Sequence, residues 1–418
     1  MVVRQGVPSD RPGLQLPASA RVGPVRRALL ALAFGSFGLA SGEFVMLGLL
    51  PNVAASVHVS IPAAGYLISA YALGVVIGAP LLTAVSVRLP RKGLLIGLVL
   101  ALAAGNVGSA AVPGFVPLLI FRFLSGLPHG AYFGVATVVA SGLVDVRRRS
   151  RAMAVVFAGL TVANIVGVPL TTFLGQHAGW RVVFGAIAAL EVLAALAITA
   201  AVPKPRRDEG ADAPALAHEL RAFRQPQVWL TLAVAVVGGG AMFATFSYIT
   251  PMMTHAAGYA ESSVALLLVL FGVGMTAGNV VGARLADHDL MHALYLGLAC
   301  ESVVAALFFL TDRNELTAAI WVALFPFTAM AIIPAVQSRL ITLAEGAPNL
   351  AAASMHSAFN IANSIGAWLG GLTIAAGYGY SSPNLVAAGL AVLGLGIALY
   401  AGSLQRRDTV VDAGPVRR

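Results

Sequence analysis

Charged side chains are scarce in this sequence. Only 10% of its 418 residues are Asp, Glu, Lys or Arg and 58% are hydrophobic, whereas a soluble globular domain carries about 25% charged residues. This deficit excludes an ordinary soluble enzyme. The 45 glycines follow no collagen-like period, so we attribute them to closely packed helices. We therefore expect an integral membrane protein that crosses the bilayer many times.

Cysteine and catalytic motifs are also nearly absent. The single cysteine, Cys300, lies in an apolar run, which excludes an intramolecular disulfide and a metal site with several thiolates. The sequence contains no HExxH motif, no GxxxxGK(S/T) phosphate loop and no recognisable Ser-His-Asp arrangement. We expect no enzyme activity, no bound metal and no cofactor.

Long apolar runs occupy most of the chain instead. A helix that spans a bilayer takes about 20 apolar residues, and breaks at Pro, Gly and charged residues delimit twelve such runs. The first run exceeds the apolar core of about 7–15 residues in a secretory signal, so we expect it to be retained as a spanning helix. The predicted spans are 28–50, 64–87, 93–112, 117–143, 152–174, 180–202, 228–251, 263–286, 291–310, 316–338, 350–376 and 384–404.

The longest connection, 203–227, divides these spans into two halves of six. We expect both chain termini and this connection to be cytoplasmic. The predicted organisation is a disordered cytoplasmic leader at 1–27, an N-terminal six-helix bundle at 28–202, a cytoplasmic loop at 203–227, a C-terminal six-helix bundle at 228–404 and a cytoplasmic tail at 405–418.

The positive charges test this topology, because cytoplasmic loops carry most of the Lys and Arg in membrane proteins. With the N-terminus inside, 23 of the 26 Lys and Arg residues fall in inside segments. Only Arg181 and Arg313 fall in outside loops, and Arg122 lies within a span. A wrong number of spans would not give this division. Membrane topology thus explains the net charge of +9 without a nucleic-acid partner.

The two halves share a small sequence repeat. Gly74 and Gly78 in the second span match Gly274 and Gly278 in the eighth, at an offset of 200 residues. The small-xxx-small spacing lets two helix backbones approach closely. Parallel six-helix repeats are typical of transporters, whose binding site lies between the repeats near the bilayer midplane.

Several stretches have a more specific pattern. The Arg122 segment places a glycine four residues after an arginine, and Trp180 opens the sixth span between a glycine and an arginine. The stretches are Ser41–Phe44 with Leu49–Pro51, Arg122–Gly126 with Leu127–Gly134, Gly159–Asn164 with Gly167 and Pro169, Gly179–Arg181, and Ser357–Asn363.

In this combination the chain resembles the major facilitator superfamily over essentially all of 28–404. Within that superfamily it resembles the twelve-helix drug–proton antiporters, in particular bacterial permeases of the arabinose/purine-efflux and chloramphenicol-resistance type. The resemblance implies an all-α membrane fold of two pseudo-symmetric six-helix bundles. It further implies a monomer in the bacterial inner (plasma) membrane, a small-molecule substrate, and a proton gradient in place of ATP.

The loop after the second span departs from the superfamily pattern, Gly-x-x-x-Asp-Arg-x-Gly-Arg-Lys. Val87 stands at the position of the Asp, whereas Asp287, 200 residues later, keeps the acid in the second half. The predicted residues of the two cytoplasmic gating loops are Arg88, Arg91, Lys92, Arg284 and Asp287.

Glu43 and Arg122 are the most informative polar residues in the spans. Glu43 lies eight residues before Pro51 and Arg122 five residues after Pro117, so both sit roughly 8–12 Å from the outer boundary. The resemblance places their helices beside a central cavity. If a conformational change altered their separation, Glu43 would take up and release a proton. The alternative is a static ion pair that only fixes helix packing.

His129 lies two helical turns after Arg122 and shares its face. It could bind substrate or relay protons, or remain a neutral side chain bonded to a backbone carbonyl. His356, Asn360 and Asn363 form one polar stripe on the eleventh span. We interpret this stripe as the lining of a substrate cavity, with interhelical hydrogen bonding as the alternative.

Asn164 on the fifth span allows the same two interpretations. Tyr248, near the outer end of the seventh span, lies beside Phe246 and would suit an amphipathic substrate, although aromatic residues also form interfacial belts. Glu191 and Glu301 fall in spans six and nine, which the resemblance assigns to the peripheral scaffold.

The sequence therefore favours a proton-coupled secondary transporter that exports a small organic molecule by alternating access. Two alternatives stay open. The first is a proton-coupled or facilitated importer of a sugar or nucleoside with the same fold. The second is a non-transporting membrane receptor or scaffold, which would gain little from burying Glu43 and Arg122.

Overall fold

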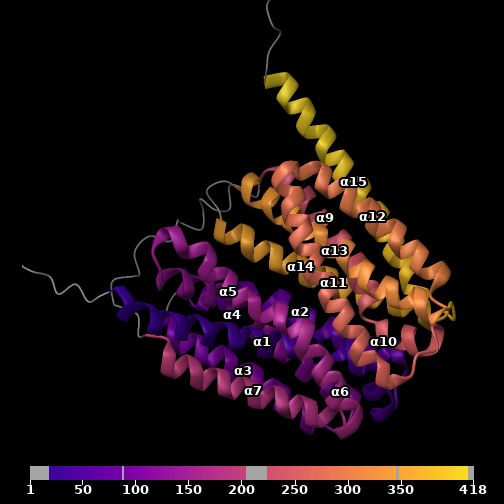
Figure 1. Cartoon of the computed structure of the whole chain (residues 1–418), viewed down its shortest axis with the longest axis horizontal. Helices are drawn as coiled ribbons and strands as arrows, with labels where there is room; N and C mark the ends of the chain where they lie inside the picture. The colour runs from indigo at the N-terminus through magenta and orange to yellow at the C-terminus, as the bar shows by residue number, and fades with distance from the viewer. Residues whose placement is uncertain (1–17, 87–88, 204–223, 345–347, 413–418) are drawn as a thin grey trace, which may run out of the picture.

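The chain folds entirely into helices in the ranges that the structure describes. The computed structural model describes residues 18–86, 89–203, 224–344 and 348–412, and every element in them is helical. Figure 1 shows an indigo-to-magenta bundle and an orange-to-yellow bundle. The predicted all-α membrane fold of two bundles is confirmed.

The first bundle is formed by the helices before residue 204. They are α1 (Ala18–Ser56), α2 (Ile61–Ser86), α3 (Arg91–Ala111), α4 (Phe115–Gly142), η1 (Val146–Arg148), α5 (Arg149–Val162), η2 (Ala163–Gly167), α6 (Val168–Ala178) and α7 (Trp180–Ala201). The second bundle is formed by the helices after residue 223. They are α9 (Pro226–Phe246), α10 (Ile249–Pro251), η3 (Met252–Ala256), α11 (Glu261–His288), α12 (Leu290–Thr311), α13 (Glu315–Leu343), α14 (Pro348–Ala375) and α15 (Pro383–Asp412).

Eleven helical segments among the described residues are long and apolar enough to cross a membrane. Helix α14 is not among them, although it has 28 residues. It carries the polar stripe of His356, Asn360 and Asn363, which lowers its mean hydropathy. The helix that contains the predicted cavity residues is therefore less apolar than the other spanning helices.

Two predicted boundaries are wrong because hydropathy marks the bilayer and not the end of a helix. Helix α1 begins at Ala18, so residues 18–27 are helical and not part of a disordered leader. Helix α15 continues to Asp412 through most of the predicted tail. Both extensions carry arginines, Arg21, Arg26 and Arg27 in the first and Arg406 and Arg407 in the second, and arginine is a good helix former in water. Residues 1–17 and 413–418 lie outside the described ranges.

Two predicted spans are interrupted near prolines, which lack a backbone N–H. The fifth span contains the π-helix η2, in which Val168 donates its N–H to Ala163 O just before Pro169. The seventh span ends as an α-helix at Phe246. There the ring of Pro251 would collide with the carbonyl four residues earlier in a continuous helix.

The glycines of the repeat bring helices into close contact, as predicted. Helix α2 crosses α4, and α11 crosses α13, with Gly74, Gly78, Gly274 and Gly278 at the crossings. A Cβ on each would overlap a backbone carbonyl of the partner helix. In the same order these carbonyls belong to Phe123, Leu127, Ala323 and Phe327. The partners thus follow the same 200-residue offset.

The two bundles are joined tightly at one end. Thr250 Oγ1 donates a hydrogen bond of 2.5 Å to Leu47 O, and Gln176 Nε2 donates one of 2.7 Å to Glu261 O. We call the end defined by these four residues the closed end. The ribbons of α6 and α10 lie near it, and the bundle axes diverge away from it (Figure 1).

Candidate functional site

Four polar side chains meet inside the first bundle. Glu43 comes from α1, Tyr71 from α2, and Arg122 and His129 from α4; they are 5%, 2%, 0% and 3% exposed. We call them the N-bundle cluster. Charged groups are costly at this depth unless they interact with one another, so their common burial marks a candidate functional site.

Arg122 meets α1 at backbone atoms. Its Nη1 donates a hydrogen bond of 2.8 Å to Gly42 O, and its Nη2 donates one of 3.3 Å to Glu43 O. The guanidinium carbon lies 4.4 Å from the centre of the Tyr71 ring. The expected contact between the helices at this depth is confirmed. The carbonyls and not the Glu43 carboxylate accept these hydrogen bonds, so the alternative of a static ion pair is wrong for this conformation.

His129 lies between Tyr71 and Glu43. Its Nδ1 is 3.1 Å from the Tyr71 hydroxyl and 3.9 Å from Glu43 Oε2. A histidine nitrogen exchanges protons near neutral pH in water, and a carboxylate and a phenol beside it offer a proton acceptor and a donor. The predicted common face of Arg122 and His129 is confirmed, because both contact Tyr71.

Sequence reasoning missed Tyr71. It lies on the same helical face as Gly74, three residues before it, and its carbonyl would overlap a Cβ on Gly126 of α4. The close glycine crossing therefore brings the tyrosine to Arg122 and His129. The three-residue spacing between Tyr71 and Gly74 was the feature of the sequence that could have identified Tyr71.

His356 lies in the seam between the bundles. Its ring stacks 5.6 Å from Phe133 and 6.0 Å from Phe157, with interplanar angles of 14° and 13°. Phe133 also lies 5.4 Å from His129. An aromatic contact therefore connects α14 of the second bundle to the N-bundle cluster.

The other predicted cavity residues are buried, and none of them lines either of the two hollows described below. Asn164, Asn360, Asn363 and Tyr248 are 5%, 2%, 2% and 1% exposed. The amides of Asn164 and Asn360 donate to their own helices, at Leu160 O and His356 O. The amide oxygens of Asn360 and Asn363 have no hydrogen-bond partner among the described residues.

Tyr248 lies in the same seam. Its hydroxyl donates a hydrogen bond of 2.8 Å to Ala367 O of α14. Its ring lies where a Cβ on Gly65 of α2 would be. A bulkier residue at Gly65 would therefore displace the Tyr248 hydroxyl from its place in the seam.

The second bundle has aromatic rings where the first has the polar cluster. Phe243 and Phe271 occupy the positions 200 residues after Glu43 and Tyr71. Phe271 stacks on Phe246 with ring centres 4.1 Å apart, and Phe44 of α1 lies 5.7 Å from Phe246. The seam therefore has a polar side and an aromatic side.

Glu191 and Glu301 are both 0% exposed, so neither carboxyl faces lipid from its scaffold helix. Asn106 Nδ2 donates to both oxygens of Glu191, at 3.1 and 2.9 Å. The oxygens of Glu301 have no hydrogen-bond partner in the part of the chain that the structure describes. The polar groups of α3, α7 and α12 are thus buried against neighbouring helices. Hydropathy alone does not show which side of a helix such a group faces.

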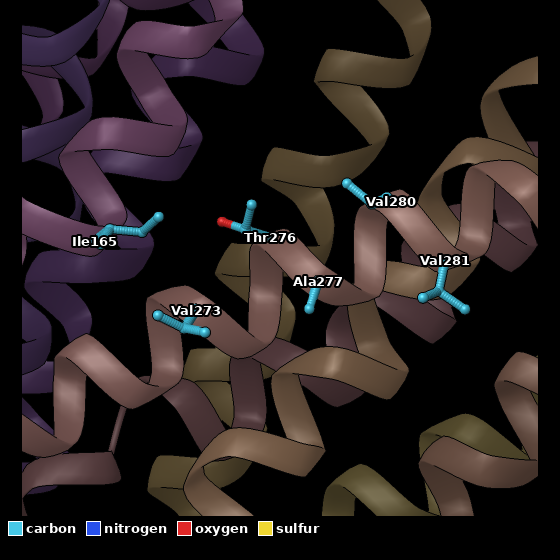
Figure 2. A pocket seen from close by; sticks show the side chains of 6 residues that line it. All are labelled: Ile165, Val273, Thr276, Ala277, Val280 and Val281. Atoms are coloured by element: carbon cyan, nitrogen blue, oxygen red, sulfur yellow. The ribbon is translucent and has the colours of Figure 1, made fainter.

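A hollow of about 350 Å³ opens beside the seam. Figure 2 shows Ile165 of η2 facing five residues of α11, which are Val273, Thr276, Ala277, Val280 and Val281. Thr276, its only hydroxyl, donates to Gly272 O. A second hollow of about 780 Å³ lies near the closed end, between α1, η3 and α14. Neither hollow is lined by the N-bundle cluster, and the lining of the first is too apolar to bind a proton.

Comparison with known proteins identifies the fold family. Residues 32–371 match the sequence pattern of the Major Facilitator Superfamily. The chain belongs to the Major Facilitator Superfamily. It is 40% identical to the "Inner membrane transport protein YdhP" of Escherichia coli (strain K12) over 92% of this chain and 97% of that protein.

Two other similarities agree with this assignment. The chain is 34% identical to the "Chloramphenicol resistance protein" of Streptomyces lividans, over 87% of this chain and 91% of that one. The crystal structure of a bacterial homologue of the human lysosomal transporter Spinster has the same fold. Its TM-score is 0.73 at 17% identity, over 91% of this chain and 96% of that one. The protein is a multi-pass membrane transporter and not an enzyme, and the predicted family resemblance is confirmed.

The predicted gating loops of the superfamily are only partly described. Arg88 lies outside the described residues, and Arg91 begins α3. Lys92 Nζ donates a hydrogen bond of 2.7 Å to Thr199 O, which joins α3 to α7. Arg284 and Asp287 are exposed on the last turns of α11. The gating role of these loops stays a prediction.

Proposed function

We propose that the chain is a proton-coupled secondary transporter that exports a small organic molecule by alternating access. The observation that carries this proposal is the Glu43 carboxylate, buried beside His129 Nδ1 at 3.9 Å and one residue from the seam contact of Phe44 with Phe246. A carboxyl at this place exchanges protons with water only when the bundles separate. Proton access and conformation are thereby coupled.

The membrane potential supplies enough energy for this exchange. One charge that crosses 100 mV contributes about 2.3 kcal/mol, which concentrates a neutral substrate roughly 50-fold. The closed end would face outward, and both termini and the connection between the bundles would be cytoplasmic. The inner-membrane name of the YdhP relative supports the bacterial plasma membrane as the location.

The substrate cavity would form when the seam opens. His129, Asn164, Tyr248, His356 and Asn360 lie in or beside the seam, as does Asn363, and opening would expose their polar atoms. The Phe243, Phe246 and Phe271 rings would form the facing wall. A polar side and an aromatic side together suit a small amphipathic molecule. The name of the chloramphenicol-resistance relative supports export over import.

Proton movement in liposomes tests the proposal. Purified protein is reconstituted with an internal pH dye and screened with chloramphenicol and other drugs, pentoses and nucleosides. We expect at least one compound to move protons with wild type and none with Glu43→Gln. Glu301→Gln is the control, because it removes a buried carboxyl away from the seam. Transport without proton movement, or normal coupling in Glu43→Gln, would refute the mechanism.

Direction is measured separately in intact cells. Expression of an exporter lowers the accumulation of the labelled compound found in the screen, and expression of an importer raises it. A rise would replace export by the proton-coupled or facilitated import of a sugar or nucleoside. Rescue by an Arg122→Ala, Glu43→Gln double variant that does not depend on any transported substrate would instead indicate a receptor or scaffold.

A further inference from the structure

Helix α1 is packed against a second polar pair on the side away from Arg122. Glu191 of α7 and Asn106 of α3 are 0% and 2% exposed and bonded to each other. A Cβ on Gly38 would lie 3.2 Å from Glu191 Cγ, and one on Gly42 would lie 3.4 Å from Asn106 Nδ2. Two glycines one turn apart let this amide–carboxyl pair touch the α1 backbone.

The same turn of α1 holds Arg122. Gly42 O accepts from Arg122 Nη1 at 2.8 Å, while the Cα side of Gly42 abuts Asn106. One peptide unit therefore separates the buried guanidinium from the amide that holds Glu191. In a low-dielectric interior, a carboxylate and a guanidinium on opposite sides of one helix turn attract each other more strongly than in water.

Arg122 requires a negative charge nearby in every state of the protein. A guanidinium is always protonated, and an uncompensated buried charge destabilises a protein by several kcal/mol. Its hydrogen-bond acceptors, Gly42 O and Glu43 O, are neutral. Among the described residues, the carboxyls that interact electrostatically with Arg122 are Glu43 and Glu191.

The two carboxyls differ in their access to the seam. Glu43 is followed by Phe44 and Leu47, which contact Phe246 and Thr250 of the second bundle. Helix α7, which carries Glu191, packs on α1, α3 and α6 of its own bundle. Opening the seam therefore exposes Glu43 to water and leaves Glu191 buried.

The hydrogen bonds of Glu191 fit an ionised carboxylate. Both oxygens accept from Asn106 Nδ2. A protonated carboxyl would donate to an acceptor, yet Asn106 Oδ1 has no partner. A carboxylate is acceptor-only, and an amide nitrogen shared by both its oxygens suits that form.

From this geometry we infer that Glu191 is the fixed counter-ion of Arg122, held by Asn106, and that Glu43 is the exchangeable one. The inference rests on the proposed function, since it concerns the proton that Glu43 carries. When Glu43 binds a proton, Arg122 stays paired with Glu191, so the proton can bind without leaving a buried charge alone. Glu191 and Asn106 are positioning residues, because neither meets the substrate.

Apart from Glu191, four titratable groups lie around Glu43 among the described residues. Tyr71 and His129 face it from α2 and α4, and Arg122 lies above its carbonyl. His356 of α14 is separated from His129 by the Phe133 ring. None of these groups is an anion at neutral pH, so Glu191 is the negative charge whose removal is informative.

Infrared spectroscopy of the purified full-length protein tests the inference with the proton itself as the probe. The carbonyl band that Glu43→Gln removes reports protonated Glu43, and its amplitude is followed from pH 4 to pH 10. In Glu191→Gln we expect the midpoint of this band to move by about one pH unit or more toward acid. Glu43 is then the only anion left to Arg122, and a proton must compete with that pairing.

Glu301→Gln is the matched control, because Glu301 is equally buried on a scaffold helix and has no partner. It should leave the Glu43 midpoint unchanged. Glu301→Gln should remove a carbonyl band, whereas Glu191→Gln should remove none near neutral pH. An unchanged midpoint in Glu191→Gln, or an equal shift in Glu301→Gln, would overturn the inference.

A second variant covers failure of Glu191→Gln to fold. Asn106→Leu removes the donor that holds the carboxylate, and it should move the Glu43 midpoint in the same direction. A wild-type midpoint in Asn106→Leu would also overturn the inference. Normal proton coupling in Glu43→Gln liposomes would instead refute the proposed function, so the two failures are distinguishable.

Discussion

Glu43 Oε2 lies 3.9 Å from His129 Nδ1, just beyond the length of a hydrogen bond. The same nitrogen is 3.1 Å from the Tyr71 hydroxyl. In the seam-closed conformation, the tyrosine therefore occupies the position of His129 that would otherwise bind Glu43. A conformational change that separates Tyr71 from His129 would allow the Glu43 carboxylate and the His129 imidazole to share a proton.

Tyr71→Phe should alter proton coupling while the fold persists. The variant keeps the ring beneath Arg122 and loses the hydroxyl that contacts His129. A buried hydrogen bond contributes about 1 kcal/mol net, so we expect roughly a five-fold change in the rate of coupled transport in liposomes. The pH profile of that rate should change with it.

Tyr132→Phe is the control for this variant. Tyr132 is also buried in the first bundle, and its hydroxyl donates to Leu32 O away from the cluster. It should lower thermal stability slightly and keep the pH profile of wild type. If both variants change the profile equally, the Tyr71 hydroxyl has no specific role in coupling.

Thr250→Val should loosen the closed end. It removes the hydrogen bond to Leu47 O across the seam and preserves the shape of the side chain. The readout is maleimide labelling of Ser247→Cys in a Cys300→Ser background, since Ser247 is 0% exposed and its hydroxyl has no partner. We expect labelling to become several-fold faster, in line with about 1 kcal/mol.

Thr254→Val separates this effect from loss of a hydroxyl in general. Thr254 Oγ1 donates to Thr250 O within its own helical segment, so its removal leaves the seam bond intact. Labelling in Thr254→Val should match that of the parent. Equal rates in the two threonine variants would mean that the Leu47 bond does not hold the bundles together.

Arg339→Lys should destabilise the second bundle. Arg339 Nε donates to Thr231 at 3.1 Å, Nη1 to Gln405 at 3.0 Å and Nη2 to Gln227 at 2.8 Å, which joins α13 to α9 and α15. An ammonium cannot reproduce this planar fork. We expect a loss of about 2–4 kcal/mol, measured as a lower melting temperature in detergent. The exposed Arg313 serves as the control, and Arg313→Lys should melt as wild type does.

The start of α12 should lose its cap in acid. The His292 backbone N–H and then its side chain hold the pKa of the Asp289 carboxyl below its usual range. The cap is therefore present above the ordinary carboxyl pKa of about 3.9 and is lost as pH falls through the lowered value. Hydrogen-exchange protection of the His292 amide should fall in that window.

Asp289→Asn keeps an acceptor that does not titrate, so protection should no longer depend on pH there. The first amides of α13, capped by the neutral Asn314 side chain, are an internal control. Their protection should not change in the same samples. Acid loss at both helix starts would indicate general unfolding and not the Asp289 cap.

The twelve-span arrangement was predictable because the bilayer imposes it on composition. Ends such as Ala18 and Asp412 were not, since helical hydrogen bonds continue into water, where hydropathy gives no signal. The break after Phe246 had a signal in Pro251, whose effect on the preceding turn is steric and local.

The candidate site was predictable in depth but not in contacts. Prolines near the span ends placed Glu43 and Arg122 at one level, and they do meet there. Which atom of Glu43 accepts the hydrogen bond depends on how α1 is rotated, which spacing does not give. Asn106 and Glu191 lie on different helices, so only the packing of α3 on α7 reveals their pairing.

Gly74→Ala should test the backbone contact that positions the N-bundle cluster. A Cβ there would overlap Phe123 O, and overpacking of this kind destabilises proteins by about 1–3 kcal/mol. The α2–α4 crossing would widen and draw Tyr71 away from Arg122 and His129. We therefore expect a lower melting temperature together with weaker proton coupling.

Gly97→Ala in α3 is the matched control, because a Cβ at Gly97 meets nothing within 4 Å, and alanine is the better helix former by about 1 kcal/mol. It should be neutral or stabilising. Normal coupling in a folded Gly74→Ala protein would show that the crossing distance does not control the site.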